Sequence, residues 1–193
     1  VSVGHGCCVL MTFPNGKTWM YDAGELGTGK KAAQSIQSVL WHAGISEIDT
    51  LFISHMDKDH FNATPHLLKS TTIRRCIVSD ATMSLSPKWK ELEELLLENG
   101  TKVETCSRSA QFNPCDHATV RVLFTGLALK QTNDNARSTV LHLQFGMHSL
   151  LLAGDIEGVG LDVLTRQAIK PIDVLLAPHG ARGFELARLE KPD

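Results

Sequence analysis

Four potential metal ligands fall within six consecutive positions, His55, Asp57, Asp59 and His60, in the segment HMDKDH. Imidazole nitrogens and carboxylate oxygens bind divalent ions such as Zn²⁺, whereas a solvated loop more often carries Lys, Glu, Ser and Gly. The segment directly follows the apolar run 48–54 (IDTLFIS), which is typical of a buried strand. Because no regular helix or strand places all four side chains on one face, we expect a loop that wraps around an ion.

Three further fragments end an apolar run at a residue type that binds metal. They contain Asp22 in WMYDAG, Asp155 in LLLAGDIE and His179 in VLLAPHGA, each with a glycine within two positions. Glycine lets the chain turn tightly at a strand end, and such ends gather at one edge of a sheet. Each fragment alone is typical of an ordinary turn, loop start or capping histidine. Together with the HMDKDH loop, in this order, they predict one shared metal site.

The elements that must position these residues are short strands and a few amphipathic helices. Their order mixes hairpins with strand–helix–strand units, which favours an α/β (α+β) fold, a four-layer αββα sandwich, over a purely parallel doubly wound sheet. We expect a single domain over residues 1–193, clipped from a longer chain because no closing strand follows the last apolar run. Strands are predicted at residues 8–13, 17–22, 48–54, 74–79, 119–126, 138–145, 149–155 and 172–178, and helices at 30–43, 87–99 and 160–169.

Composition narrows the class of protein. The 193 residues are 42% hydrophobic and 21% charged, as in an ordinary globular domain, and the net charge of −2 includes no basic stripe for tight nucleic-acid binding. No apolar run approaches the roughly 20 residues of a membrane helix, although a parent protein could contain one. The five cysteines form no C-x-x-C pair, and the odd count with adjacent Cys7 and Cys8 predicts free thiols and a cytoplasmic, reducing location.

The motifs resemble those of the metallo-β-lactamase fold superfamily, and more finely the C-terminal domain of ComEC-type DNA-uptake (competence) proteins. That family has H-x-D-x-D-H rather than the commoner H-x-H-x-D-H, as this sequence does. Its opening "VGQGD" is similar to residues 3–7 (VGHGC), and its N-x-x-S segment to residues 135–138. Its "LLTGD" and "VPHHGS" segments are similar to SLLLAGDIE and VLLAPHG here. The resemblance covers essentially the whole chain but lacks the family's last strand.

The resemblance implies two divalent ions, zinc or manganese, about 3.5–4 Å apart. One ion would be bound by His55 and Asp57, the other by Asp59, His60 and His179, with Asp155 bridging both. Asp59 and Asp155 are the implied catalytic residues. The implied metal ligands are therefore His55, Asp57, Asp59, His60, Asp155 and His179.

A second set of residues would support the ligands or meet the substrate. The resemblance implies that Asp22 accepts a hydrogen bond that orients a histidine, and that Asn135 and Ser138 lie near the site. Lys58 and Arg137 are placed to meet an anionic substrate, or simply to offset the charges of the carboxylates.

The implied activity is that of a dinuclear phosphodiesterase or nuclease of the DNA-uptake type, with a metal-activated water and single-stranded DNA as the candidate substrate. Hydrolysis of a thioester or lactam would instead be expected with H-x-H-x-D-H. Departures from the family pattern favour an alternative, a metal-binding but catalytically weak interaction or structural domain. Cys7 replaces the usual acid of the opening motif, His179 is a single histidine, and Ala181 stands where serine is usual.

Overall fold

The structure is a computed structural model that describes residues 1–126, 133–167 and 172–178. The chain divides into two compact units. The first unit comprises Val1–Val78 and Thr82–Thr105, and the second comprises Ser79–Ala81 and the chain from Cys106 onwards. Each unit contains a five-stranded sheet with helices, so the predicted mixed α/β fold is confirmed. That residues 1–193 form a single domain stays a prediction.

The sheet of the first unit has the strand order β1-β2-β4-β6-β7. A hairpin joins β1 to β2 in antiparallel register, and β2, β4 and β6 run parallel to one another. A separate two-stranded parallel sheet pairs β3 with β5. The strands are β1 (Val9–Thr12), β2 (Thr18–Tyr21), β3 (Glu47–Ile48), β4 (Thr50–Phe52), β5 (Thr72–Ile73), β6 (Arg75–Ser79) and β7 (Lys102–Cys106).

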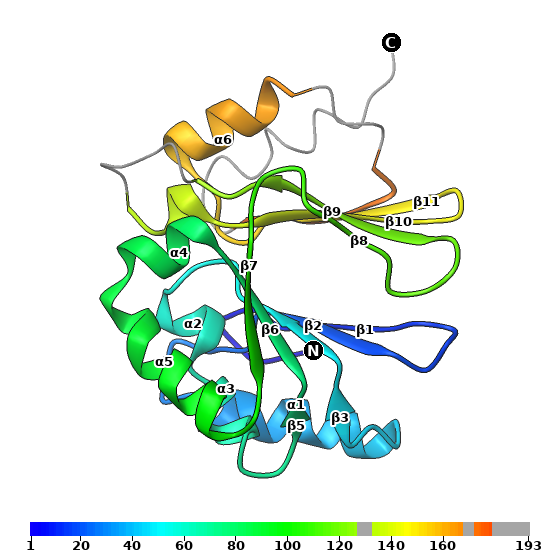
Figure 1. Ribbon diagram of the computed structural model, residues 1–193, viewed down its shortest axis with the longest axis vertical. Helices are drawn as coiled ribbons and strands as arrows, with labels where there is room; N and C mark the ends of the chain where they lie inside the picture. The colour runs from blue at the N-terminus through cyan, green and yellow to red at the C-terminus, as the bar shows by residue number, and fades with distance from the viewer. Residues whose placement is uncertain (127–132, 168–171, 179–193) are drawn as a thin grey trace. The chain divides into compact units, whose positions relative to one another are not determined.

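Helices α1, α3 and α5 lie on one side of this sheet (Figure 1). Helix α1 buries Ile36 and Leu40, and α5 buries Leu92 and Leu96, in one apolar cluster with sheet residues such as Met20. This spacing of three and four residues places the apolar side chains of each helix on a single face. The helices are α1 (Lys30–His42), α2 (Lys58–Phe61), α3 (Thr64–Leu67), α4 (Asp80–Leu85) and α5 (Pro87–Glu98).

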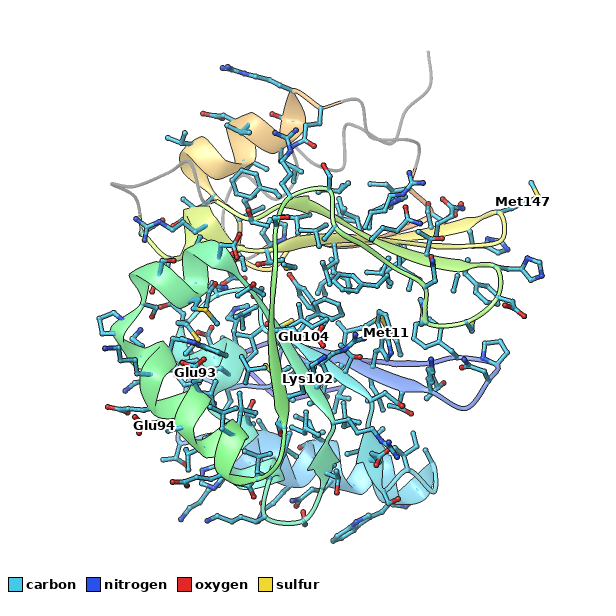
Figure 2. All side chains as sticks on the ribbon, in the orientation of Figure 1. Met11, Glu93, Glu94, Lys102, Glu104 and Met147 are labelled. Carbon is cyan, nitrogen blue, oxygen red and sulfur yellow. The ribbon has the colours of Figure 1, made fainter. Side chains whose placement is uncertain are left out.

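The sheet of the second unit has the order β12-β11-β10-β9-β8, antiparallel except for the parallel pair β11 and β12. Helix α6 packs Leu161 and Leu164 against Val140 and Leu151 of this sheet. Met147 projects from the tip of the β10–β11 hairpin and is 93% exposed (Figure 2). The elements are β8 (Gln111–Phe112), β9 (Ala118–Phe124), η1 (Asn135–Arg137), β10 (Val140–Phe145), β11 (His148–Leu152), α6 (Gly158–Thr165) and β12 (Val174–Leu176).

Most predicted strands and helices are present, with one strand divided in two. The run 48–54 breaks at Asp49, whose backbone nitrogen donates to Thr18 O at 2.8 Å and whose carboxylate accepts from Thr18 N at 2.8 Å. Because these two bonds join Asp49 to Thr18 at the start of the neighbouring strand β2, the run is divided at Asp49 into β3 and β4. Strands β5, β7 and β8 and helices α2, α3 and α4 were not predicted. Their lengths of two to six residues give little periodic pattern.

In the part of the chain that the structure describes, no helix is long and apolar enough to cross a membrane. All five cysteines lie in that part and none forms a disulfide there. Burial raises the pKa of the Cys8 and Cys106 thiols to about 12, because the apolar surroundings disfavour the thiolate.

Candidate metal centre

The first residues of the site lie at the ends of two parallel strands of the first unit. Asp22 directly follows β2, and Ser54 and His55 follow β4, its parallel neighbour. The ladder extends past the strands, with Asp22 N donating to Phe52 O at 2.8 Å. Parallel register therefore places Asp22 beside the start of the HMDKDH segment.

The Asp22 carboxylate is fully buried and accepts three hydrogen bonds of 2.7 Å. The donors are the Ser54 backbone N–H, the Ser54 hydroxyl and His60 Nδ1. Asp22 has a φ of 58°, in the left-handed region that is uncommon for residues other than glycine. Backbone strain of this kind concentrates at functional sites, and here the surrounding hydrogen bonds stabilise it.

These hydrogen bonds assign the tautomer of both histidines. The Ser54 hydroxyl has one proton and donates it to Asp22, so its oxygen accepts from His55 Nδ1 at 2.9 Å. His60 Nδ1 donates its proton to Asp22. In both rings Nε2 then has the lone pair that a metal ion requires. Ser54 is a candidate site residue that the sequence did not indicate.

The two aspartates of the loop lie near these Nε2 atoms. Asp57 Oδ2 is 3.8 Å from His55 Nε2, and Asp59 Oδ2 is 3.9 Å from His60 Nε2. Both distances are too long for hydrogen bonds but close to the roughly 3.4 Å that separates two ligands of one tetrahedral ion with bonds of about 2.1 Å. The ring centroids of His55 and His60 are 4.2 Å apart. The donor set is thus compatible with divalent metal, arranged as two histidine–aspartate pairs.

The opening segment of the chain supports the loop through backbone contacts. Cys7 N donates to Asp59 O at 2.9 Å, and Ala23 N donates to His60 O at 2.7 Å. A Cβ added at Gly24 would lie 2.4 Å from the Asp59 carbonyl carbon, so only glycine permits this approach. Ligand atoms of Cys7, Asp22 and His60 all lie within 4.8 Å of one another, which places the Cys7 thiol at the site itself.

A lysine from helix α5 reaches the same loop. Lys88 Nζ donates to Met56 O at 2.9 Å and lies 3.4 Å from Asp57 Oδ1. The two charged side chains are 47% and 42% exposed. Lys58, which was expected near the substrate, is exposed at the start of α2. The sequence did not indicate Lys88.

The remaining predicted residues belong to the second unit or lie outside the described residues. Asp155 follows β11 and its backbone nitrogen donates to Ser138 Oγ at 3.3 Å. Asn135 begins η1 and its Oδ1 atom is buried. Asp155 and Ser138 are therefore neighbours within this unit. His179 lies outside the described residues. That Asp155 and His179 share a site with the HMDKDH loop stays a prediction.

The chain belongs to the metallo-beta-lactamase superfamily, whose sequence profile matches residues 1–182. Among characterised proteins, ComE operon protein 3 of Bacillus subtilis (strain 168) is 29% identical over 142 residues. The matched part is 72% of this chain but only 18% of that protein, so the chain spans less than a fifth of this relative. The resemblance inferred from the motifs is confirmed.

Solved structures confirm the fold at low sequence identity. PqqB from Methylobacterium extorquens, solved with Zn²⁺, is 11% identical, with a TM-score of 0.59 over 89% of this chain and 59% of that one. A motif mutant of a metallo-beta-lactamase from Cronobacter sakazakii is 18% identical, with a TM-score of 0.57 over 94% and 77%. The diiron hydroxylase CmlA of Streptomyces venezuelae is 23% identical, with a TM-score of 0.56 over 99% and 37%. Two of these neighbours thus bind metal, PqqB zinc and CmlA iron.

Proposed function

We propose that this chain is a metal-dependent hydrolase that cleaves phosphodiesters, with single-stranded DNA as its substrate, at a centre of two zinc or manganese ions. The observation that supports this most strongly is the pair of buried histidines whose tautomers direct Nε2 towards Asp57 and Asp59. Two separate histidine–aspartate pairs on one loop suit two ions better than one.

The bound ions would supply an acidified water and positive charge for the phosphate oxygens. The chain's own residues would orient these ions. Asp22 and Ser54 fix the histidine rings, which reduces the reorganisation needed at the centre. Asp59, 17% exposed, is accessible enough to contact both an ion and the substrate. We assign Asp155 and His179 as the ligands that complete the set.

The choice of DNA is supported by the competence relative and by the H-x-D-x-D-H pattern rather than by a nucleic-acid surface. Asp57 adds a carboxylate where the commoner motif has histidine, which shifts the preference towards harder ions such as Mn²⁺. The five free thiols support a reducing, cytoplasmic location.

The second candidate is a metal-binding domain with a structural or interaction role. It is favoured by the ion pair between Lys88 and Asp57, which gives one candidate ligand another partner, and by the thiol of Cys7 beside His60. This candidate predicts metal binding without turnover.

The test is an assay of the purified chain on single-stranded and double-stranded DNA with added Mn²⁺, Zn²⁺ or Mg²⁺. Asp155→Asn keeps the shape of the side chain but removes a charge that both ions would need. We expect a loss of at least about 10²-fold in rate, with loss of metal. The matched control is Asp116→Asn, an exposed carboxylate of the second unit. No metal-dependent cleavage by the unmodified chain would overturn the hydrolase and favour the interaction domain.

A further inference from the structure

Lys88 reaches the HMDKDH loop from helix α5. It belongs to the first turn of α5, and its ammonium group donates to Met56 O at 2.9 Å, next to His55. This bond fixes the ammonium group at the loop rather than leaving it on a mobile side chain. We propose that Lys88 binds a phosphate of the substrate beside the metal centre, an inference that depends on the proposed function for its biological meaning.

The charge balance of the loop changes when metal binds. Without metal, Asp57 Oδ1 at 3.4 Å is the counter-ion of Lys88. An ion bound by Asp57 offsets the charge of that carboxylate, which leaves the charge of Lys88 available to another anion. An ammonium group has three protons, of which one is donated to Met56 O and one faces Asp57. The third can be donated to a phosphate oxygen.

The amino-terminal end of helix α5 carries a partial positive charge, of the same sign as Lys88. Its N-cap residue is Ser86, whose side chain makes no capping hydrogen bond to the helix. Ser86 Oγ is buried and has no hydrogen-bond partner among the residues that the structure describes. The amino-terminal end of a helix of 12 residues therefore remains uncapped by this side chain, and such ends attract anions. Lys88 lies in the first turn of this helix, so its charge and the positive end of the helix dipole have the same sign.

Lys90 provides a matched comparison, because it is exposed on the same helix two positions later. Replacing either lysine with methionine removes one positive charge and keeps most of the side-chain length. The ammonium group of Lys88 is hydrogen-bonded to the loop backbone at Met56 O. A general effect of net charge would therefore weaken binding alike in both variants, whereas a phosphate site at Lys88 would weaken it in Lys88→Met alone.

The experiment measures binding, so that it does not depend on turnover. Fluorescence anisotropy would follow a labelled, phosphorothioate-linked oligothymidylate, which resists cleavage and keeps its charges, with Mn²⁺-loaded and with metal-free protein. For Lys88→Met loaded with Mn²⁺, we expect about tenfold weaker binding and a slope of log affinity against log salt that is smaller by about 0.7. Lys90→Met should stay within about twofold of the unmodified chain. Without metal, Lys88→Met and the unmodified chain should bind equally.

Three binding results with Mn²⁺-loaded protein would overturn the phosphate site. They are equal binding by Lys88→Met and the unmodified chain, an equal loss in Lys90→Met, and no binding by the unmodified chain. Manganese content is measured in parallel, and loss of metal from Lys88→Met would also overturn it, because the lysine would then act on the loop alone. Binding that depends on Lys88, without any cleavage of ordinary DNA, would instead contradict the hydrolase and leave the phosphate site in place.

Discussion

The two sides of the candidate centre differ in how their side chains are fixed. The histidine side consists of Asp22, Ser54, His55 and His60, which are at most 2% exposed and joined by hydrogen bonds of 2.7–2.9 Å. The carboxylate side consists of Asp57 and Asp59, which are 42% and 17% exposed. A substitution on the histidine side should therefore change both the free energy of unfolding and the affinity for metal. A substitution on the carboxylate side should change the affinity for metal alone.

The fold fixes the histidine side more firmly than the carboxylate side. A buried carboxylate with three donors cannot change its partners without breaking the core around it, so the histidine tautomers are set before metal arrives. The carboxylates of Asp57 and Asp59 are more accessible and can adjust to an ion or a substrate at lower cost. Substitutions on the two sides should consequently have different signatures.

The largest effect is expected from Asp22→Asn. Asparagine tolerates the left-handed backbone of position 22, but its NH₂ group would face the Ser54 hydroxyl and His60 Nδ1, both donors in the native site. His60 would have to move its proton to Nε2. We expect a loss of about 2–4 kcal/mol in the free energy of unfolding and at least about tenfold weaker zinc binding. Urea unfolding in chelator and zinc titration measure the two effects.

The matched control is Asp49→Asn, because Asp49 also accepts a backbone hydrogen bond, from Thr18, but lies away from the site. Nitrogen NMR of the imidazole rings reports the tautomer directly. A variant at Asp22 that kept Nδ1 protonated in His60 and bound zinc normally would disprove the coupling.

A smaller effect is expected at high pH from the thiol of Cys106, whose pKa is raised mainly by burial and further by the charge of Asp80. A cysteine whose pKa is raised in the folded state, here to about 12 at Cys106, stays protonated while the unfolded chain ionises near pH 9. The contribution of this thiol to the free energy of unfolding is intact below pH 9 and is lost as the pH rises from there towards 12. Between pH 9 and pH 10 the loss approaches about 1 kcal/mol for this thiol.

Urea unfolding at pH 8 and pH 10 checks this expectation. Cys106→Ala should show a shallower loss of stability with pH than the unmodified chain, whatever its stability at pH 8. Equal losses in the two proteins would show that the Cys106 thiol ionises as readily folded as unfolded.

The smallest effect on stability is expected from Asp57→Asn, although this substitution changes a proposed ligand. The side chain is 42% exposed, and exposed ion pairs such as that with Lys88 contribute little, so the free energy of unfolding should change by less than about 0.5 kcal/mol. Metal binding should nevertheless weaken by about tenfold or more. A large loss of stability in metal-free buffer would erase the distinction between the two sides.

The sequence indicated the parts of the site that lie in local patterns. The loop around His55 was recognisable because its ligand types directly follow an apolar strand, and Asp22 because glycine and a strand end surround it. Ser54 and Lys88 could not be recognised, because their partners are 32 and 31 residues away and ordinary serine and lysine give no local signal. Chain reversal and packing decide such contacts.

The elements of the fold were likewise predictable only where the sequence has a strong local pattern. Long apolar runs such as β9, and amphipathic helices such as α1 and α5, were predicted because their periodicity is strong. Strand β7 (KVETC) was missed because it carries charged residues, including Lys102 and Glu104, whose side chains form an ion pair of 2.8 Å (Figure 2). It is the edge strand of its sheet among the described residues, where charge is tolerated and discourages further pairing.

The most direct test of the account is the number of divalent ions that each chain retains. The protein would be loaded with Zn²⁺ or Mn²⁺, dialysed against metal-free buffer and measured by mass spectrometry for metal per chain. The two histidine–aspartate pairs predict two ions per chain. A content of one or none would contradict the dinuclear centre.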